Sequence, residues 1–123
     1  MIINKEQKEL LHFFNNVMIK LNIHGWKLIL NEDKSEGYCW INKKNIDIGL
    51  NYENPKELLI HEIAHINICR FCNNKHTFDF WKTFLDYMRR FIPKEKISKN
   101  ASNHMKFAGN GYYRKCYDDE KRI

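Results

Sequence analysis

The chain has 123 residues, of which 43% are hydrophobic and 14% aromatic, and this composition excludes an intrinsically disordered chain and predicts a single domain with its own core. The formal net charge is +6, and residues 93–123 carry +4 of it, which predicts a basic C-terminal extension beside a nearly neutral domain of residues 1–92. No apolar run approaches the roughly 18 residues of a membrane helix, no N-terminal signal segment is visible, and the cysteines are too scattered for a disulfide framework, so we expect a cytoplasmic protein with no membrane partner.

The first segment with a regular pattern is residues 4–25, in which apolar residues recur with a helical period. Leu10, Phe14 and Val17 fall on one face of such a helix. Gly25 is the expected stop, because glycine commonly follows the last helical turn. The pattern therefore predicts an amphipathic N-terminal helix.

Residues 26–50 are rich in strand-forming side chains, interrupted by polar turns. Three strands are predicted, over residues 26–30, 38–41 and 45–50. In the third strand apolar and polar residues alternate, so one of its faces is expected to be buried. Together with the first helix, these strands predict an α+β fold with a small antiparallel sheet.

Two further helices are predicted after the sheet. Asn54 and Pro55 form a strong helix start, and this helix is expected to run to about Cys72. The next helix is expected from Thr77, a natural N-cap, to Phe91. Its aromatic residues fall on one stripe, which predicts a side that faces the core.

The sequence HEIAH, residues 61–65, lies in the middle of the first of these two helices. Residues four apart on a helix share a face, so His61 and His65 are placed to bind one Zn²⁺ ion. Glu62 is expected to project beside the ion, where it can take a proton from water. The alternative is that both histidines belong to the core and that Glu62 pairs with one of them.

A hydrolytic zinc site needs a third protein ligand and one open position. His76 is the best candidate, because it lies at the junction where the second helix can fold back beside the first. Asp86 is the acidic alternative, although it is expected on the charged face of its helix. The extended metzincin motif is excluded, since Phe71 stands where its third histidine would be.

The order of helix, small sheet, HEIAH helix and a later HTFDFW segment resembles the SprT-like zinc metallopeptidases and the related WLM-type and YgjP-type domains. The resemblance covers residues 26–91 and implies a compact zincin-like fold. Carried over residue by residue, it implies that His61, His65 and His76 bind zinc and that Glu62 is the general base. It also implies one Zn²⁺ per chain and a protein or peptide substrate.

The chain departs from SprT-like proteins in two ways. Thr77 stands where they often carry a glycine, and the cysteines of the C-terminal zinc ribbon that many of them have are missing. Because the best-known members of the family degrade proteins crosslinked to DNA, DNA is a further expected partner, reached through the basic extension. The residues expected to contact it are Lys96, Lys99, Lys106, Arg114 and Lys115.

The predicted strand of residues 45–50 immediately precedes the HEIAH helix. We expect an extended substrate to pair with this strand, as substrates of zincins generally do. The general base would then act on a peptide bond held at the strand's edge.

Two other functions remain open. One is a zincin with an acidic third ligand, similar to the ImmA/IrrE-like peptidases that cleave a regulator. The other is a non-catalytic binding module that keeps the zincin shape. The intact Glu62 argues against the second, because a module without activity has no need of a general base.

Overall fold

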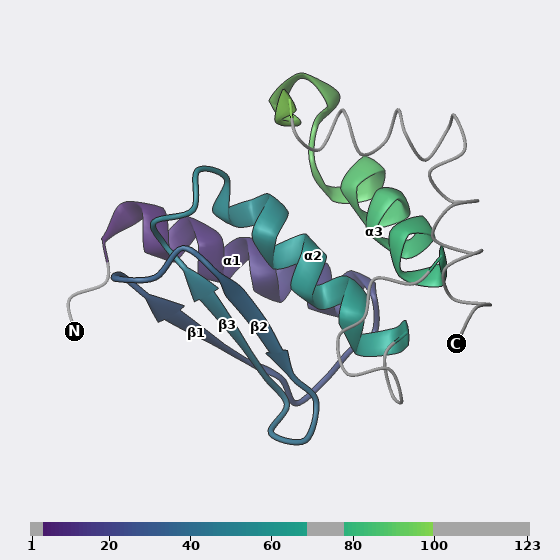
Figure 1. Cartoon of the computed structure of the whole chain (residues 1–123), viewed down its shortest axis with the longest axis horizontal. Helices are drawn as coiled ribbons and strands as arrows, with labels where there is room; N and C mark the ends of the chain where they lie inside the picture. The colour runs from purple at the N-terminus through teal and green to yellow at the C-terminus, as the bar shows by residue number, and fades with distance from the viewer. Residues whose placement is uncertain (1–3, 69–77, 100–123) are drawn as a thin grey trace. The chain divides into compact units, whose positions relative to one another are not determined.

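The computed structural model describes residues 4–68 and 78–99, and its element order confirms the α+β fold class (Figure 1). An N-terminal helix, a small sheet, the HEIAH helix and a following helix occur in the predicted order. No helix among the described residues is long and apolar enough to cross a membrane. The elements are α1 (Lys5–Lys20), β1 (Lys27–Asn31), β2 (Gly37–Trp40), β3 (Asn45–Gly49), α2 (Pro55–Ile68), α3 (Phe78–Phe91) and a short 3-10 helix (Lys94–Lys96).

Both ends of α1 are capped by short-range hydrogen bonds. At the start, the Asn4 side chain accepts from the Gln7 amide, and the Gln7 side chain accepts from the Asn4 amide, which forms a capping box. At the end, Asn22 adopts a left-handed φ of 56°, and the Ile23 amide donates to the carbonyl of Met18. This is a Schellman motif with asparagine in the glycine position. The helix therefore ends before Asn22, and the predicted stop at Gly25 is wrong.

The sheet has the strand order β1-β3-β2 and is mixed. The predicted antiparallel pairing is found between β2 and β3, whereas β1 pairs with β3 in parallel. Because β3 is the central strand, both of its edges are occupied. The prediction that an extended substrate pairs with the strand of residues 45–50 is therefore wrong.

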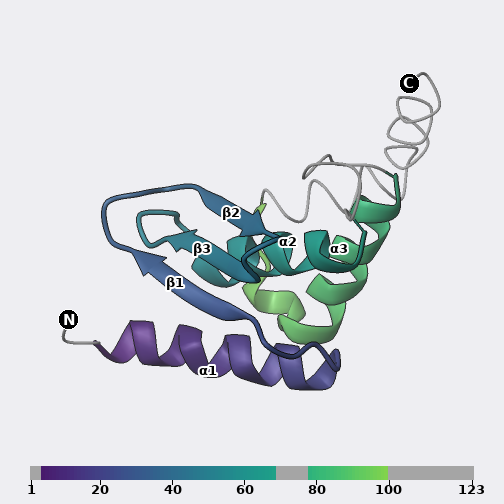
Figure 2. The same ribbon diagram turned by 90° about the horizontal axis from the view of Figure 1, so that it is seen from below.

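The two faces of the sheet differ in burial. Cys39, Ile46 and Ile48 are almost fully buried on one face, as the alternation in the third strand predicted. On the other face Ile29, Tyr38 and Trp40 are all more than 40% exposed. In Figure 2, α1 runs alongside β1, and residues of the two elements are in contact.

The contacts within the chain divide it into two compact units, residues 1–62 and 63–123. In the second unit, the aromatic stripe of α3 is buried from Phe80 to Tyr87 as predicted, whereas Phe91 at the end of the helix is half-buried. Asp79 and Lys82 are exposed on the other face of the helix. The buried residues of α3 are Phe80, Trp81, Phe84, Leu85, Tyr87 and Met88. The division predicted at residues 92/93 stays a prediction.

Candidate metal centre

Helix α2 carries the HEIAH sequence and is anchored by apolar residues on both sides of the motif. Leu59, Ile60, Ile63 and Ala64 are completely buried. The start of the helix follows the prediction, because the amides of Glu57 and Leu58 both donate to the carbonyl of Asn54. The predicted end at Cys72 lies outside the described residues. The helix therefore holds its polar positions 61, 62 and 65 in fixed directions.

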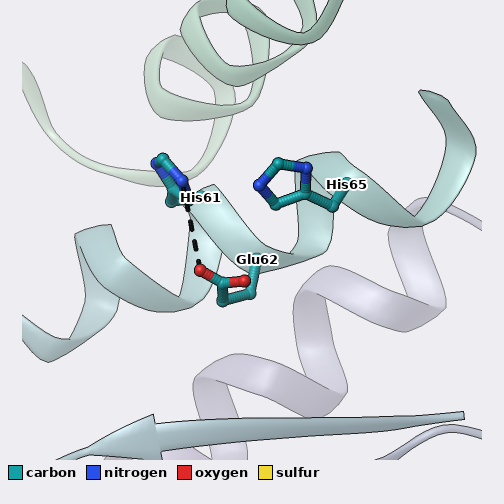
Figure 3. A group of neighbouring side chains, drawn as sticks. All are labelled: His61, Glu62 and His65. Atoms are coloured by element: carbon teal, nitrogen blue, oxygen red, sulfur yellow. Dashed lines mark ion pairs between the residues drawn. The ribbon is translucent and has the colours of Figure 1, made fainter. Parts of the chain in front are cut away.

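His61, Glu62 and His65 form a group that could hold a metal ion. Their potential ligand atoms all lie within 4.8 Å of one another. Figure 3 shows the two imidazoles on the same side of α2, one turn apart, with the Glu62 carboxylate next to them. The spacing of four residues thus places both histidines on one face of the helix, as predicted.

The donor set of this group fits a divalent transition metal. Imidazole nitrogens suit zinc, and a tetrahedral Zn²⁺ ion at about 2.0–2.1 Å from each ligand keeps its ligand atoms somewhat over 3 Å apart. The candidate ligand atoms of His61 and His65 lie within 4.8 Å of each other, which is close to this separation. His61 keeps one side of the group open, since its side chain is 24% exposed.

His65 is held in place by an aromatic residue of α3. Its ring stacks on Phe80 with the ring centroids 4.2 Å apart and the planes inclined by 20°. His65 is only 2% exposed, and Phe80 is completely buried. Phe80 is itself packed edge-on against Trp81. The ring plane of His65 is therefore fixed by packing, which reduces the freedom that a metal ligand would lose on binding.

Glu62 is buried against the first residue of β2. A Cβ atom at Gly37 would lie 3.0 Å from Cγ and 3.2 Å from Oε2 of Glu62, so a larger residue here would fit only if the Glu62 side chain moved slightly. The carboxylate oxygen Oε2 also lies 4.0 Å from Nε2 of His61. Burial raises the pKa of Glu62 to about 8. A positive charge at the two histidines would lower this pKa and favour the ionised form that a general base requires.

The structure describes only one of the two candidates for the third metal ligand. His76 lies outside the described residues. Asp86 lies on the exposed face of α3, where its carboxylate is 3.9 Å from Arg90, and it does not join the group formed by His61, Glu62 and His65. The exposed position of Asp86 agrees with the prediction that this residue lies on the charged face of its helix. This position weighs against Asp86 as a metal ligand.

The basic residues predicted to contact DNA are described only in part. Lys96, at the end of the 3-10 helix, and Lys99 are exposed. Lys106, Arg114 and Lys115 lie outside the described residues. The two described lysines are thus accessible, and their role stays a prediction.

Sequence reasoning missed Gly37 as part of the site. The signal was present, because a glycine at the boundary between a turn and a strand often marks a close approach of another group. What the sequence does not contain is the identity of that group, which follows only from the packing of β2 beside α2.

Comparison of the sequence with protein-family models and with curated proteins gives no match.

Proposed function

We propose that the protein is a zinc-dependent metallopeptidase of the SprT-like kind that hydrolyses peptide bonds. One observation supports this most directly: the ligand atoms of two imidazoles and a buried carboxylate, from adjacent turns of one helix, lie within 4.8 Å of one another. His61 and His65 would hold the ion, His76 would complete the ligand set, and Glu62 would be the general base. Zinc, when bound, supplies a Lewis acid that activates water and polarises the carbonyl of the peptide bond.

The edge of the sheet nearest to Glu62 offers a place for an extended substrate. In the described part of the chain only β3 pairs with β2, so the other edge of β2 is open. The Gly49 amide donates to the Glu36 carbonyl, and in an antiparallel ladder alternate residues face the same partner. The N–H and C=O of Gly37 therefore point toward the open edge, beside the Glu62 side chain. This edge of β2 replaces β3 as the proposed pairing site for substrate.

Different residues of the chain would position the substrate and transfer the proton. A substrate paired with β2 is positioned by backbone hydrogen bonds, which are independent of its sequence. Glu62 takes a proton from water and passes it to the leaving amine. Its burial excludes competing solvent, and the contact with Gly37 limits the directions that its carboxylate can take.

The experiment is a paired measurement of zinc and of peptide hydrolysis. Wild type, His65→Ala, Glu62→Gln and the surface control His12→Ala are loaded with zinc, analysed by elemental mass analysis and incubated with unfolded casein. We expect one zinc per chain in wild type, Glu62→Gln and His12→Ala, with hydrolysis absent only from Glu62→Gln among these three. We expect His65→Ala to lose the metal. Retained hydrolysis in Glu62→Gln would refute the mechanism.

Proteins associated with DNA are one candidate class of substrate within this proposal. The exposed Lys96 and Lys99 support it, since both carry charge toward solvent. Binding to single-stranded DNA that is insensitive to salt, or that survives removal of residues 94–123, would exclude the extension as its site.

A further inference from the structure

The strand that borders the candidate site also carries a pair of exposed aromatic rings. Tyr38 and Trp40 are 43% and 45% exposed on the outer face of β2. Their rings are stacked, with centroids 5.7 Å apart and planes inclined by 28°. Isolated apolar residues on a surface are ordinary, but two adjacent large rings on an edge strand form a continuous apolar surface.

Hydrogen bonds hold both rings in place. The Trp40 indole N–H donates to Oδ2 of Asp47 over 3.1 Å, and the Tyr38 hydroxyl donates to Oε2 of Glu36 over 2.7 Å. The Lys43 ammonium lies 5.5 Å from the centroid of the Trp40 ring. A partner that contacts the rings therefore meets surfaces that are already ordered, which lowers the entropy lost on binding.

The position of the pair relates it to the reaction. Tyr38 directly follows Gly37, which lies against Glu62, and Trp40 is two residues further along the strand. Side chains of a strand alternate between the two faces, and neighbours across a pair of strands lie about 5 Å apart. A peptide paired with the open edge of β2 would thus place every second side chain beside Tyr38 or Trp40.

We propose that Tyr38 and Trp40 select substrates with apolar side chains at two alternate positions close to the scissile bond. This inference rests on the proposed function, because it takes a peptide on the edge of β2 as the occupant. It goes further by naming the substrate class and the residues that determine it.

The charges around the rings favour an apolar peptide over charged ligands. Glu36 and Asp47 place carboxylates next to the two rings, which disfavours acidic side chains and the phosphates of a nucleic acid. The ammonium group of Lys43, which lies beside Trp40, disfavours basic side chains of the peptide near that ring. Apolar side chains meet none of these repulsions and gain contact with the rings.

The test separates binding from turnover. Labelled ten-residue peptides that carry Leu, Phe, Glu, Lys or Ser at two alternate positions are bound to the zinc-loaded full chain with Glu62→Gln, and binding is followed by fluorescence anisotropy. We expect the Leu and Phe peptides to bind more tightly than the Glu, Lys and Ser peptides, by about fivefold for each side chain that contacts one of the two rings. The preference should fall below twofold when Tyr38→Ser or Trp40→Ser is added.

Two further variants control for structure. Tyr38→Phe keeps the ring and loses the hydrogen bond to Glu36, and it should keep the preference. Ile29→Ser removes an exposed side chain of the same face from β1, which β3 separates from β2, and it should have no effect. An unchanged preference in Tyr38→Ser and Trp40→Ser, or its loss in Ile29→Ser, would overturn the inference.

The failure of the inference is distinguishable from that of the proposed function. Cleavage of the same peptides by wild type without any apolar preference would overturn the inference and leave the function standing. Absence of cleavage together with an apolar preference that the serine variants lose would overturn the function and leave the recognition surface standing. Binding of an oligothymidine that the serine variants lose, with no peptide preference, would assign the face to nucleic acid and overturn the inference.

Discussion

Gly37 at the start of β2 and Glu62 in the middle of α2 approach each other so closely that a Cβ atom at position 37 would stand 3.0 Å from Cγ and 3.2 Å from Oε2 of Glu62. In a Gly37→Ala variant the Glu62 side chain would have to give way by a few tenths of an ångström. We expect zinc content to stay at the wild-type value and peptide hydrolysis to fall about tenfold, because small displacements of catalytic groups lower the rate.

The control for this prediction is Ser35→Ala, which changes an exposed residue of the preceding turn. Equal zinc content with equal activity in Gly37→Ala and Ser35→Ala would show that the contact with Gly37 does not position Glu62. Thermal unfolding of both variants separates lost activity from lost folding.

The raised pKa of Glu62 predicts a pH dependence of stability in protein stripped of metal. Its pKa is about 8 in the folded chain and near 4.5 when unfolded. Between these two pH values the Glu62 carboxyl group is therefore protonated in the folded chain and ionised in the unfolded chain. The stabilisation is fully present below about pH 4.5 and is lost as the pH rises through 8. Because a difference of one in pKa corresponds to about 1.4 kcal/mol, the advantage of Glu62→Gln over wild type should grow by more than this from pH 5 to pH 8.

Urea unfolding at both pH values measures this difference, with a chelator present throughout. His12→Ala is again the control, since His12 is exposed on α1 and should unfold like wild type. An equal change in the unfolding free energy of wild type and Glu62→Gln between pH 5 and pH 8 would mean that burial does not perturb the carboxyl group.

The identity of the third ligand is tested by His76→Ala and Asp86→Asn. The exposed Asp86, which lies 3.9 Å from Arg90, is not expected to bind the metal. We therefore expect His76→Ala to weaken zinc binding at least tenfold and Asp86→Asn to leave it unchanged, as measured by competition with a chromogenic chelator. The reverse result would favour the acidic-ligand zincin.

The capping box of α1 predicts a stability effect remote from the site. Asn4→Ala removes the acceptor for the Gln7 amide and should lower the free energy of unfolding by about 1 kcal/mol. Asn15→Ala, on the exposed middle of the same helix, should be neutral or slightly stabilising, because alanine is the better helix former. Chemical unfolding of the two variants, followed by circular dichroism, gives both values.

The sequence was most informative where the determining contacts are local. The start of α2 at Asn54 and the spacing of His61 and His65 depend on residues within one or two turns, so both were predictable. The parallel pairing of β1 with β3 depends on segments far apart in the chain, and no local pattern encodes it. The close approach of Gly37 to Glu62 is of the same long-range kind.

The end of α1 shows a different limit. Asn22 and Gly25 are both residues that tolerate a positive φ, and both adopt one, at 56° and 81°. Sequence reasoning favoured glycine as the stronger helix terminator, but the Schellman hydrogen bonds form at Asn22.

The histidine pair has a consequence for how the protein would acquire its metal. His61 and His65 belong to adjacent turns of one helix, so these two ligands of the proposed ion are brought together by the folding of α2 alone. Zinc fingers differ, because their ion crosslinks elements that do not otherwise assemble. Here the helix is already held by Leu59, Ile60 and Ile63, which bind no metal. Under the proposed function, the chain would therefore be able to fold first and bind its metal ion afterwards.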